Sequence, residues 1–118
     1  MREVQRALSD IGIPVFALVW RPIGMQKTAP DQYVVYTTMT TEDEHWDDSP
    51  IRYKIYVYLN LWSKADPTEK QMAIRNAMRL NGFEMVEETD SFEDDTKMYE
   101  VSSTWVLWKD VGSDGMDD

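Results

Sequence analysis

Residues Ile51 to Trp62 alternate between two kinds of side chain, and this pattern constrains the fold more than any other. One set is largely aliphatic: Ile51, Tyr53, Ile55, Val57, Leu59 and Leu61. The other set is Arg52, Lys54, Tyr56, Tyr58, Asn60 and Trp62. Because successive side chains of a strand point to opposite faces, the period of two predicts a long β-strand with its aliphatic face against the core.

The second face of this strand combines cations with large aromatic rings, a composition typical of surfaces that bury against a partner. We therefore identify a candidate oligomer interface that also includes a tryptophan of the last predicted strand: Arg52, Lys54, Tyr56, Tyr58, Trp62 and Trp108. The alternative is that the chain's own helices or loops cover these rings. Both interpretations remain open from the sequence.

A helix is predicted immediately after the strand. Asp66 suits the N-cap, and Pro67 suits the first helical position. Glu69 stands three residues after the cap, as the acidic residue of a capping box does. The pair Asn81-Gly82 predicts the end of the helix. Between these ends, one side is apolar: Met72, Ala73, Ile74, Ala77, Met78 and Leu80.

The remaining elements follow from periodicity and turn residues. The sequence predicts a helix over 1–9, strands over 15–20, 33–41, 83–88 and 97–109, and acidic connections over 42–50 and 89–95. The resulting order is α-β-β-β-α-β-β. We expect an α/β fold of the α+β type, with two helices on one face of a single, mostly antiparallel or mixed sheet of about five strands.

Length and composition indicate one domain. The chain has 118 residues and a mass of 13.8 kDa, which predicts a single domain over 1–109 and an acidic, disordered tail over 110–118. It has no cysteine, which is compatible with a reducing compartment. The apolar run from Ile13 to Trp20 is too short to cross a bilayer, so we expect an intracellular protein that does not bind membranes.

Acidic residues outnumber basic ones by 22 to 12, giving a formal charge of -10. This balance argues against a general affinity for nucleic-acid phosphates. Sixteen of the acids form three blocks, with five in 42–48, seven in 84–95 and four in 110–118. Solvated loops and a disordered tail are the ordinary explanation of such blocks.

Residues that would carry catalysis or bind a cofactor are scarce. His45 is the single histidine and lies beside Trp46 and Asp47, but a metal or catalytic site needs further convergent groups. The acidic blocks lack the residue pattern of an EF-hand, and no glycine-rich phosphate loop or nucleophile elbow occurs. We expect no catalytic residue, no metal and no cofactor.

Several short segments form a recognisable series. A strand Tyr33-Val34-Val35-Tyr36 enters an acidic turn, and the strand from Arg52 to Val57 runs on into Leu61-Trp62-Ser63-Lys64-Ala65-Asp66. A helix then ends at Asn81-Gly82-Phe83, and Tyr99 to Trp105 closes the sheet. Over roughly Tyr33 to Trp108, this series resembles the small tail-completion, or tail-terminator, proteins of long-tailed bacteriophages.

The resemblance implies a structural virion protein without enzymatic activity or cofactor. Such a subunit forms a six-membered homo-oligomeric ring at the head-proximal end of the tail tube, stops tube growth, and joins the tail to the head. Its partners would be the tail tube protein and head–tail connector proteins, and assembly would occur in the host cytoplasm.

In such a ring, DNA would pass through the lumen without specific binding, because acidic walls repel phosphate. The candidate lumen-facing residues, expected in acidic loops, are Glu42, Asp43, Glu44, Asp47, Asp48, Glu87, Glu88, Asp90, Glu93, Asp94 and Asp95.

Two alternatives remain open from the sequence. A head–tail adaptor or connector subunit would also assemble as an oligomer, but it would contact different neighbouring proteins. A small ligand-binding or hydrolytic α/β domain would instead have a pocket with convergent polar groups around His45 or Trp46.

Overall fold

The structure is a computed structural model that describes residues 2–17, 30–46 and 49–110 of the chain. For residues 42–46, 49–51 and 110 it describes the backbone alone. The elements, in order, are α1 (Arg2–Ala7), β1 (Val15–Ala17), β2 (Gln32–Trp46), β3 (Ser49–Ser63), α3 (Thr68–Leu80), β4 (Glu84–Glu93) and β5 (Met98–Asp110).

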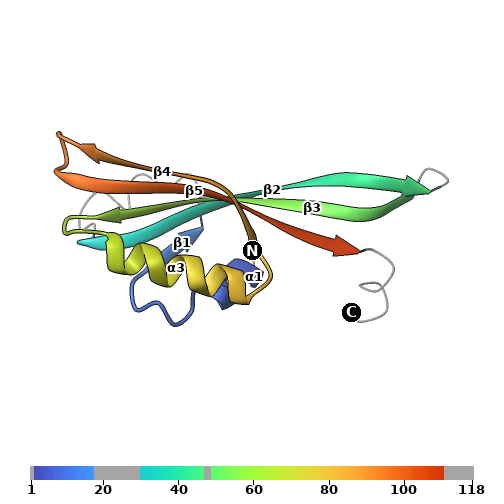
Figure 1. The fold of residues 1–118 in the computed structure, drawn as a ribbon, viewed down its shortest axis with the longest axis horizontal. Helices are drawn as coiled ribbons and strands as arrows, with labels where there is room; N and C mark the ends of the chain where they lie inside the picture. Colours follow the sequence, from blue (N-terminus) through green and yellow to red (C-terminus); the bar gives the residue numbers. More distant parts are fainter. Residues whose placement is uncertain (1, 18–29, 47–48, 111–118) are drawn as a thin grey trace.

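The five strands form one sheet in the order β1-β2-β3-β5-β4. β1 pairs with β2 in parallel, and the other pairings are antiparallel. α1 and α3 lie against the same face of this sheet (Figure 1). The described residues therefore confirm an α+β fold with one mixed sheet of five strands and two helices.

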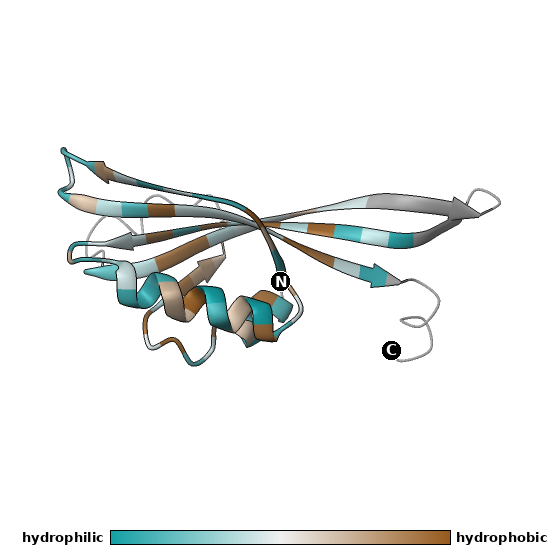
Figure 2. Ribbon diagram, viewed as in Figure 1, coloured by the Kyte–Doolittle hydropathy of each residue, from teal (hydrophilic) through white to brown (hydrophobic). Residues whose placement is uncertain are grey.

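The core lies between the helices and the face of the sheet that they cover. The predicted aliphatic face of β3 contributes Val57, Leu59 and Leu61 to this core, and Ile55 on the same face is also buried. The other buried contributors come from both helices, their flanking segments and two further strands: Val4, Leu8, Val34, Tyr36, Ile74, Met78, Phe83, Val101 and Trp105. Figure 2 shows hydrophobic and hydrophilic residues alternating along the strands and around α3, as this one-sided burial requires.

The hairpin of β2 and β3 is longer than predicted and extends beyond the helices (Figure 1). The acidic connection predicted over 42–50 is wrong, because β2 continues to Trp46 and β3 begins at Ser49. In this extension Glu44 stands opposite Arg52, after an irregularity in the register. Backbone pairing does not depend on side-chain charge, and an acidic position opposite a basic one suits an antiparallel pair.

Three candidate lumen-facing acids are therefore strand residues rather than loop residues: Glu42, Asp43 and Glu44. Two further candidates, Asp47 and Asp48, lie outside the described residues. The same is true of residues 18–20 of the first predicted strand, which is described from Val15 to Ala17, and of 111–118 in the predicted tail. Asp110, assigned to the tail, ends β5.

The second acidic connection also begins later than predicted. β4 continues to Glu93, five residues beyond the predicted end at Glu88. Asp90 and Glu93 therefore lie in this strand, together with Glu87 and Glu88 of its predicted part, whereas Asp94 and Asp95 lie in the turn that follows. Acidic residues are tolerated here because β4 is the last strand in the sheet order, and charged side chains are common on edge strands.

The start of α3 differs by one residue from the prediction. Pro67 occupies the N-cap position, and Thr68 is the first helical residue. Asp66 still accepts hydrogen bonds from the backbone N–H of Thr68 at 3.0 Å and from its hydroxyl at 2.7 Å. These bonds lower the pKa of the Asp66 carboxyl because they favour its charged form. Asp66 therefore has the expected role of binding a first-turn N–H, although it precedes the cap.

The predicted end of α3 is confirmed, and it forms a Schellman motif. Gly82 N–H donates to the carbonyl oxygen of Arg79 at 3.1 Å, and Phe83 N–H donates to that of Met78 at 3.1 Å. Gly82 has a φ of +90°, a conformation that glycine adopts without steric cost. Phe83 is buried at the start of the next segment, so the turn directs the chain from α3 into β4.

Candidate interaction surface

The face of the sheet away from α1 and α3 is the candidate site, and we call it the open face (Figure 1). The strand register defines its members: Tyr33, Val35, Thr37 and Met39 in β2; Arg52, Lys54, Tyr56, Tyr58, Asn60 and Trp62 in β3; and Ser102, Thr104, Val106 and Trp108 in β5. All six candidate interface residues lie on it. Neither described helix covers this face, so in the described residues the rings do not lie under the chain's own helices.

Four of the candidates form one cluster around Trp108. Lys54 of β3 stands directly opposite Trp108 of β5 in the register. The guanidinium carbon of Arg52 lies 4.1 Å from the centre of the Trp108 ring. The Lys54 ammonium lies 4.7 Å from the same ring and 5.5 Å from the ring of Tyr56. Cations are attracted to the faces of aromatic side chains, so Trp108 and Tyr56 hold Arg52 and Lys54 in place on this surface.

Apolar surface adjoins this cluster along the hairpin. Tyr58 is stacked with Tyr56, with ring centres 6.3 Å apart and an interplanar angle of 14°. Tyr58 is 37% exposed, and Met39, opposite Tyr56 on β2, is 46% exposed. The open face therefore presents apolar area next to positive charge, a combination suited to protein contacts.

Trp62 does not belong to the cluster. It lies eight residues further along β3 than Lys54, which corresponds to about 27 Å along a strand. Its cross-strand neighbours are Tyr33 of β2 and Glu100 of β5. At that end of the sheet, Tyr33 contacts Phe16 edge-to-face at 6.2 Å between ring centres. The sequence groups Trp62 with the other candidates because it shares their face, but the structure separates it from them.

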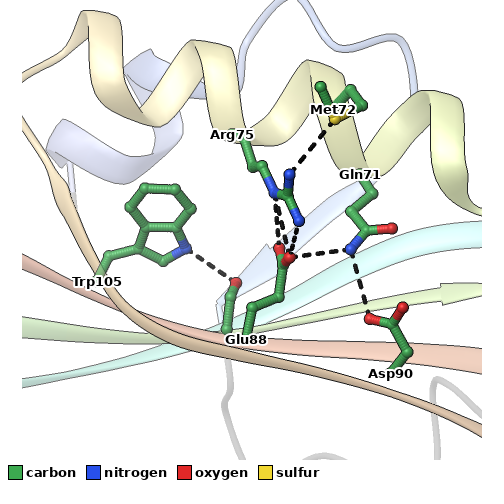
Figure 3. A network of polar contacts seen from close by, with 7 residues as sticks. Gln71, Met72, Arg75, Glu88, Asp90 and Trp105 are labelled. Carbon is green, nitrogen blue, oxygen red and sulfur yellow. Dashed lines mark hydrogen bonds and ion pairs between the residues drawn. The ribbon is translucent and has the colours of Figure 1, made fainter.

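Glu88 is not a loop carboxylate but a structural link between α3 and β4 (Figure 3). Its side chain is 11% exposed and pairs with the Arg75 guanidinium, whose Nε lies 3.1 Å from Oε1. Gln71 Nε2 also donates to Glu88 Oε1 at 3.0 Å. Burial raises the pKa of Glu88, but the hydrogen bonds from Arg75 and Gln71 outweigh it, and the pKa is lowered overall.

The other acids of β4 remain on the surface. Asp90 accepts a bond of 3.4 Å from the same Gln71 amide, and Asp94 and Asp95 are exposed in the turn. We call one exposed set in this strand the acidic edge: Glu84, Val86, Glu87, Phe92 and Glu93. The register places Glu84, Glu87 and Glu93 on the side of the open face and Phe92 on the helix-bearing side. Two of its side chains are exposed hydrophobic groups that sequence reasoning missed, Val86 at 56% and Phe92 at 48%. A register shift next to Val86 interrupts the alternation that would have revealed its orientation.

Two open cavities occur on the helix-bearing side of the described chain. One, of about 310 Å³, lies between the first turn of α3 and the strand pair β4–β5, with Gln71, Phe92 and Tyr99 in its lining. The other, of about 460 Å³, lies between the segment after α1 and α3, with Ile11, Lys70 and Leu80 in its lining. The pocket considered around His45 or Trp46 involves side chains outside those described.

Within the described residues, no group of three or more His, Cys, Asp or Glu side chains is arranged to hold a metal ion. None of the helices described has the length and apolar character needed to cross a membrane. Comparison with known proteins adds no identification, since no family model matches the chain and no curated protein matches it significantly.

Proposed function

We propose that this protein is a structural virion subunit, a tail terminator that forms a ring at the head-proximal end of a bacteriophage tail tube. The observation that supports this proposal best is the open face, where Tyr58 and Met39 are exposed beside the cations Arg52 and Lys54. The resemblance of the segment from Tyr33 to Trp108 to tail terminators points to the same function.

The shape of the sheet suits ring assembly. A closed ring of identical subunits needs two different contact surfaces on each subunit, one for each neighbour. The cluster around Trp108 offers one contact area on the open face, and the acids of β4 offer another at the margin of the same face, where Glu84 stands opposite Val106 and Glu87 opposite Thr104. The long β2–β3 hairpin projects beyond the helices, so it can contact a neighbour without disturbing the core (Figure 1).

The charge of the chain suits a passage for DNA. A formal charge of -10 repels phosphate, so a ring of such subunits would not retain DNA during ejection. Glu88 pairs with Arg75 and is not free to face a lumen. For the other candidate acids, a position facing the lumen remains a prediction of this proposal. The proposed partners are further copies of the chain, the tail tube protein and head–tail connector proteins.

The test is electron microscopy of the purified protein, followed by its addition to growing tail tubes. We expect six-membered rings, and tubes that stop lengthening once the protein caps them. A protein that stays monomeric at all concentrations and leaves tube growth unchanged would overturn the proposal. Rings that bind the head connector and leave tube growth unchanged would instead identify an adaptor.

A further inference from the structure

We propose that the cavity between the first turn of α3 and the β4–β5 pair binds the guanidinium group of an arginine side chain presented by another protein. The cavity has a volume of about 310 Å³ and lies on the helix-bearing side of the sheet, away from the open face. Its lining combines exposed aromatic rings with carboxylates, and the described lining contains no cation. A partner can therefore occupy the cavity whether or not copies of the chain meet through the open face.

The register of β4 and β5 builds the floor of the cavity. Phe92 of β4 stands directly opposite Tyr99 of β5. Two residues earlier in β4, Asp90 stands opposite the buried Val101. These four side chains share the helix-bearing face, because Tyr99 and Val101 alternate in step with the buried Trp105. The first turn of α3 forms the opposite wall, so rings and carboxylates border one space.

The aromatic pair supplies a surface that attracts cations. The rings of Phe92 and Tyr99 have centres 4.9 Å apart and an interplanar angle of 65°. Phe92 is 48% exposed and Tyr99 is 38% exposed, so this edge-to-face contact buries neither ring. The face of an aromatic ring carries partial negative charge, and a guanidinium group stacks against it. Two partly exposed rings in one cavity therefore favour a planar cation as the ligand.

Two carboxylates of the lining reinforce this preference. Asp66 Oδ1 accepts two hydrogen bonds from the first residue of α3, at 3.0 and 2.7 Å. Asp90 Oδ1 accepts one bond of 3.4 Å from the Gln71 amide. Neither carboxylate pairs with a cation among the described residues, whereas Arg75, one turn further along α3, is bound to Glu88. The negative charge of the lining is therefore available to a ligand.

The chemistry of the lining selects arginine among the cationic side chains. A guanidinium group is planar and can stack on a ring while it donates parallel hydrogen bonds to a carboxylate. A lysine ammonium is a strongly hydrated point charge, which gains less from an aromatic surface. The volume of about 310 Å³ lies at the lower end of the range for ligand pockets, so it suits one side chain. Because arginine is enriched in protein interfaces, we assign the occupant to a protein partner.

The experiment is saturation-transfer NMR of the full chain with N-acetylarginine methylamide, a probe that presents the arginine side chain without charged termini. Saturation transfer detects weak ligands of proteins in any oligomeric state. We expect the arginine compound to bind. The corresponding norleucine compound, which has no charge, should bind about tenfold or more weakly, and the lysine compound about threefold or more weakly.

Substitutions in the lining locate the site. Asp90→Asn and Phe92→Leu should each weaken binding of the arginine compound about threefold or more, because one removes a charge and the other a ring. Phe92→Tyr keeps the ring and should bind as the parent does. The matched control is Glu87→Gln, which removes an exposed carboxylate from the same strand on the side of the open face. It should also bind as the parent does, and circular dichroism checks the folding of every variant.

Each contrary result overturns a defined part of the proposal. Binding that is absent, or that either Asp90→Asn or Phe92→Leu leaves unchanged, overturns the site. Equal binding of the arginine and lysine compounds overturns the selection of arginine. If the arginine compound weakens self-association of the parent in analytical ultracentrifugation, a second copy fills the cavity and the assignment to another protein is overturned. A parent that forms no rings overturns the ring function and leaves this site standing.

Discussion

At the scale of single residues, the buried polar group of Trp105 is satisfied within its own strand, β5. Its side chain is fully buried, and its indole N–H donates to the hydroxyl of Ser103 at 2.9 Å. We predict that Ser103→Ala lowers the free energy of unfolding by about 1–3 kcal/mol, because it leaves a buried donor without an acceptor. Urea unfolding would measure this. Ser103→Thr, which keeps the hydroxyl, should lose less, and equal losses would exclude the hydrogen bond as the cause.

The Arg75–Glu88 pair predicts a pH dependence. The pKa of Glu88 is lower in the folded state than in the unfolded state, where it is about 4.3. The ionised Glu88 therefore contributes its full stabilisation above the unfolded pKa, and this stabilisation is lost as the pH falls through the folded pKa. We expect Glu88→Gln to lower the free energy of unfolding by about 1–2 kcal/mol at neutral pH.

The loss of unfolding free energy caused by Glu88→Gln should become smaller as the pH falls. Denaturant unfolding of the variant and the parent at pH 7 and pH 3 would measure this change. Glu87→Gln is the matched control on the exposed part of the same strand, and it should change stability by less than about 0.5 kcal/mol. A deficit for Glu88→Gln that is the same at both pH values would contradict the ion-pair interpretation.

At the scale of elements, the turn between α3 and β4 depends on one backbone conformation. Gly82 adopts a φ of +90°, and a Cβ built there would meet Leu107 Cδ1 at an ordinary 3.5 Å. The expected cost of Gly82→Ala is therefore conformational rather than steric, about 1–2 kcal/mol of unfolding free energy. Thermal and denaturant unfolding would measure it. Gly82→Asn should be less harmful, because asparagine tolerates this conformation, and identical losses would point to a steric cause.

At the scale of the whole molecule, the open face should matter for assembly and not for folding. Tyr58 is 37% exposed on that face, whereas the core lies on the other side of the sheet. We predict that Tyr58→Glu reduces self-association about tenfold or more while leaving the circular dichroism spectrum unchanged. The control, Met72→Glu, changes an exposed residue of α3 with 46% exposure and should assemble normally. A Tyr58→Glu variant that assembles fully, or that unfolds, would contradict the assignment of this face.

The sequence by itself determined the features that depend on local periodicity and backbone geometry. The alternation in β3 identified its buried face, because the pleat of a strand places every second side chain on one side. The glycine at position 82 identified the end of α3 because few other residues adopt its φ.

Only the tertiary structure decided which distant residues meet. Trp108 joins Lys54 because the β3–β5 register places them opposite each other, and no local pattern specifies that register. Likewise, charge suggested that Glu88 was a solvated loop residue, but α3 packs above it and supplies Arg75 as a partner. A sequence shows how many charges a segment carries, whereas packing decides which of them remain in solvent and which are paired.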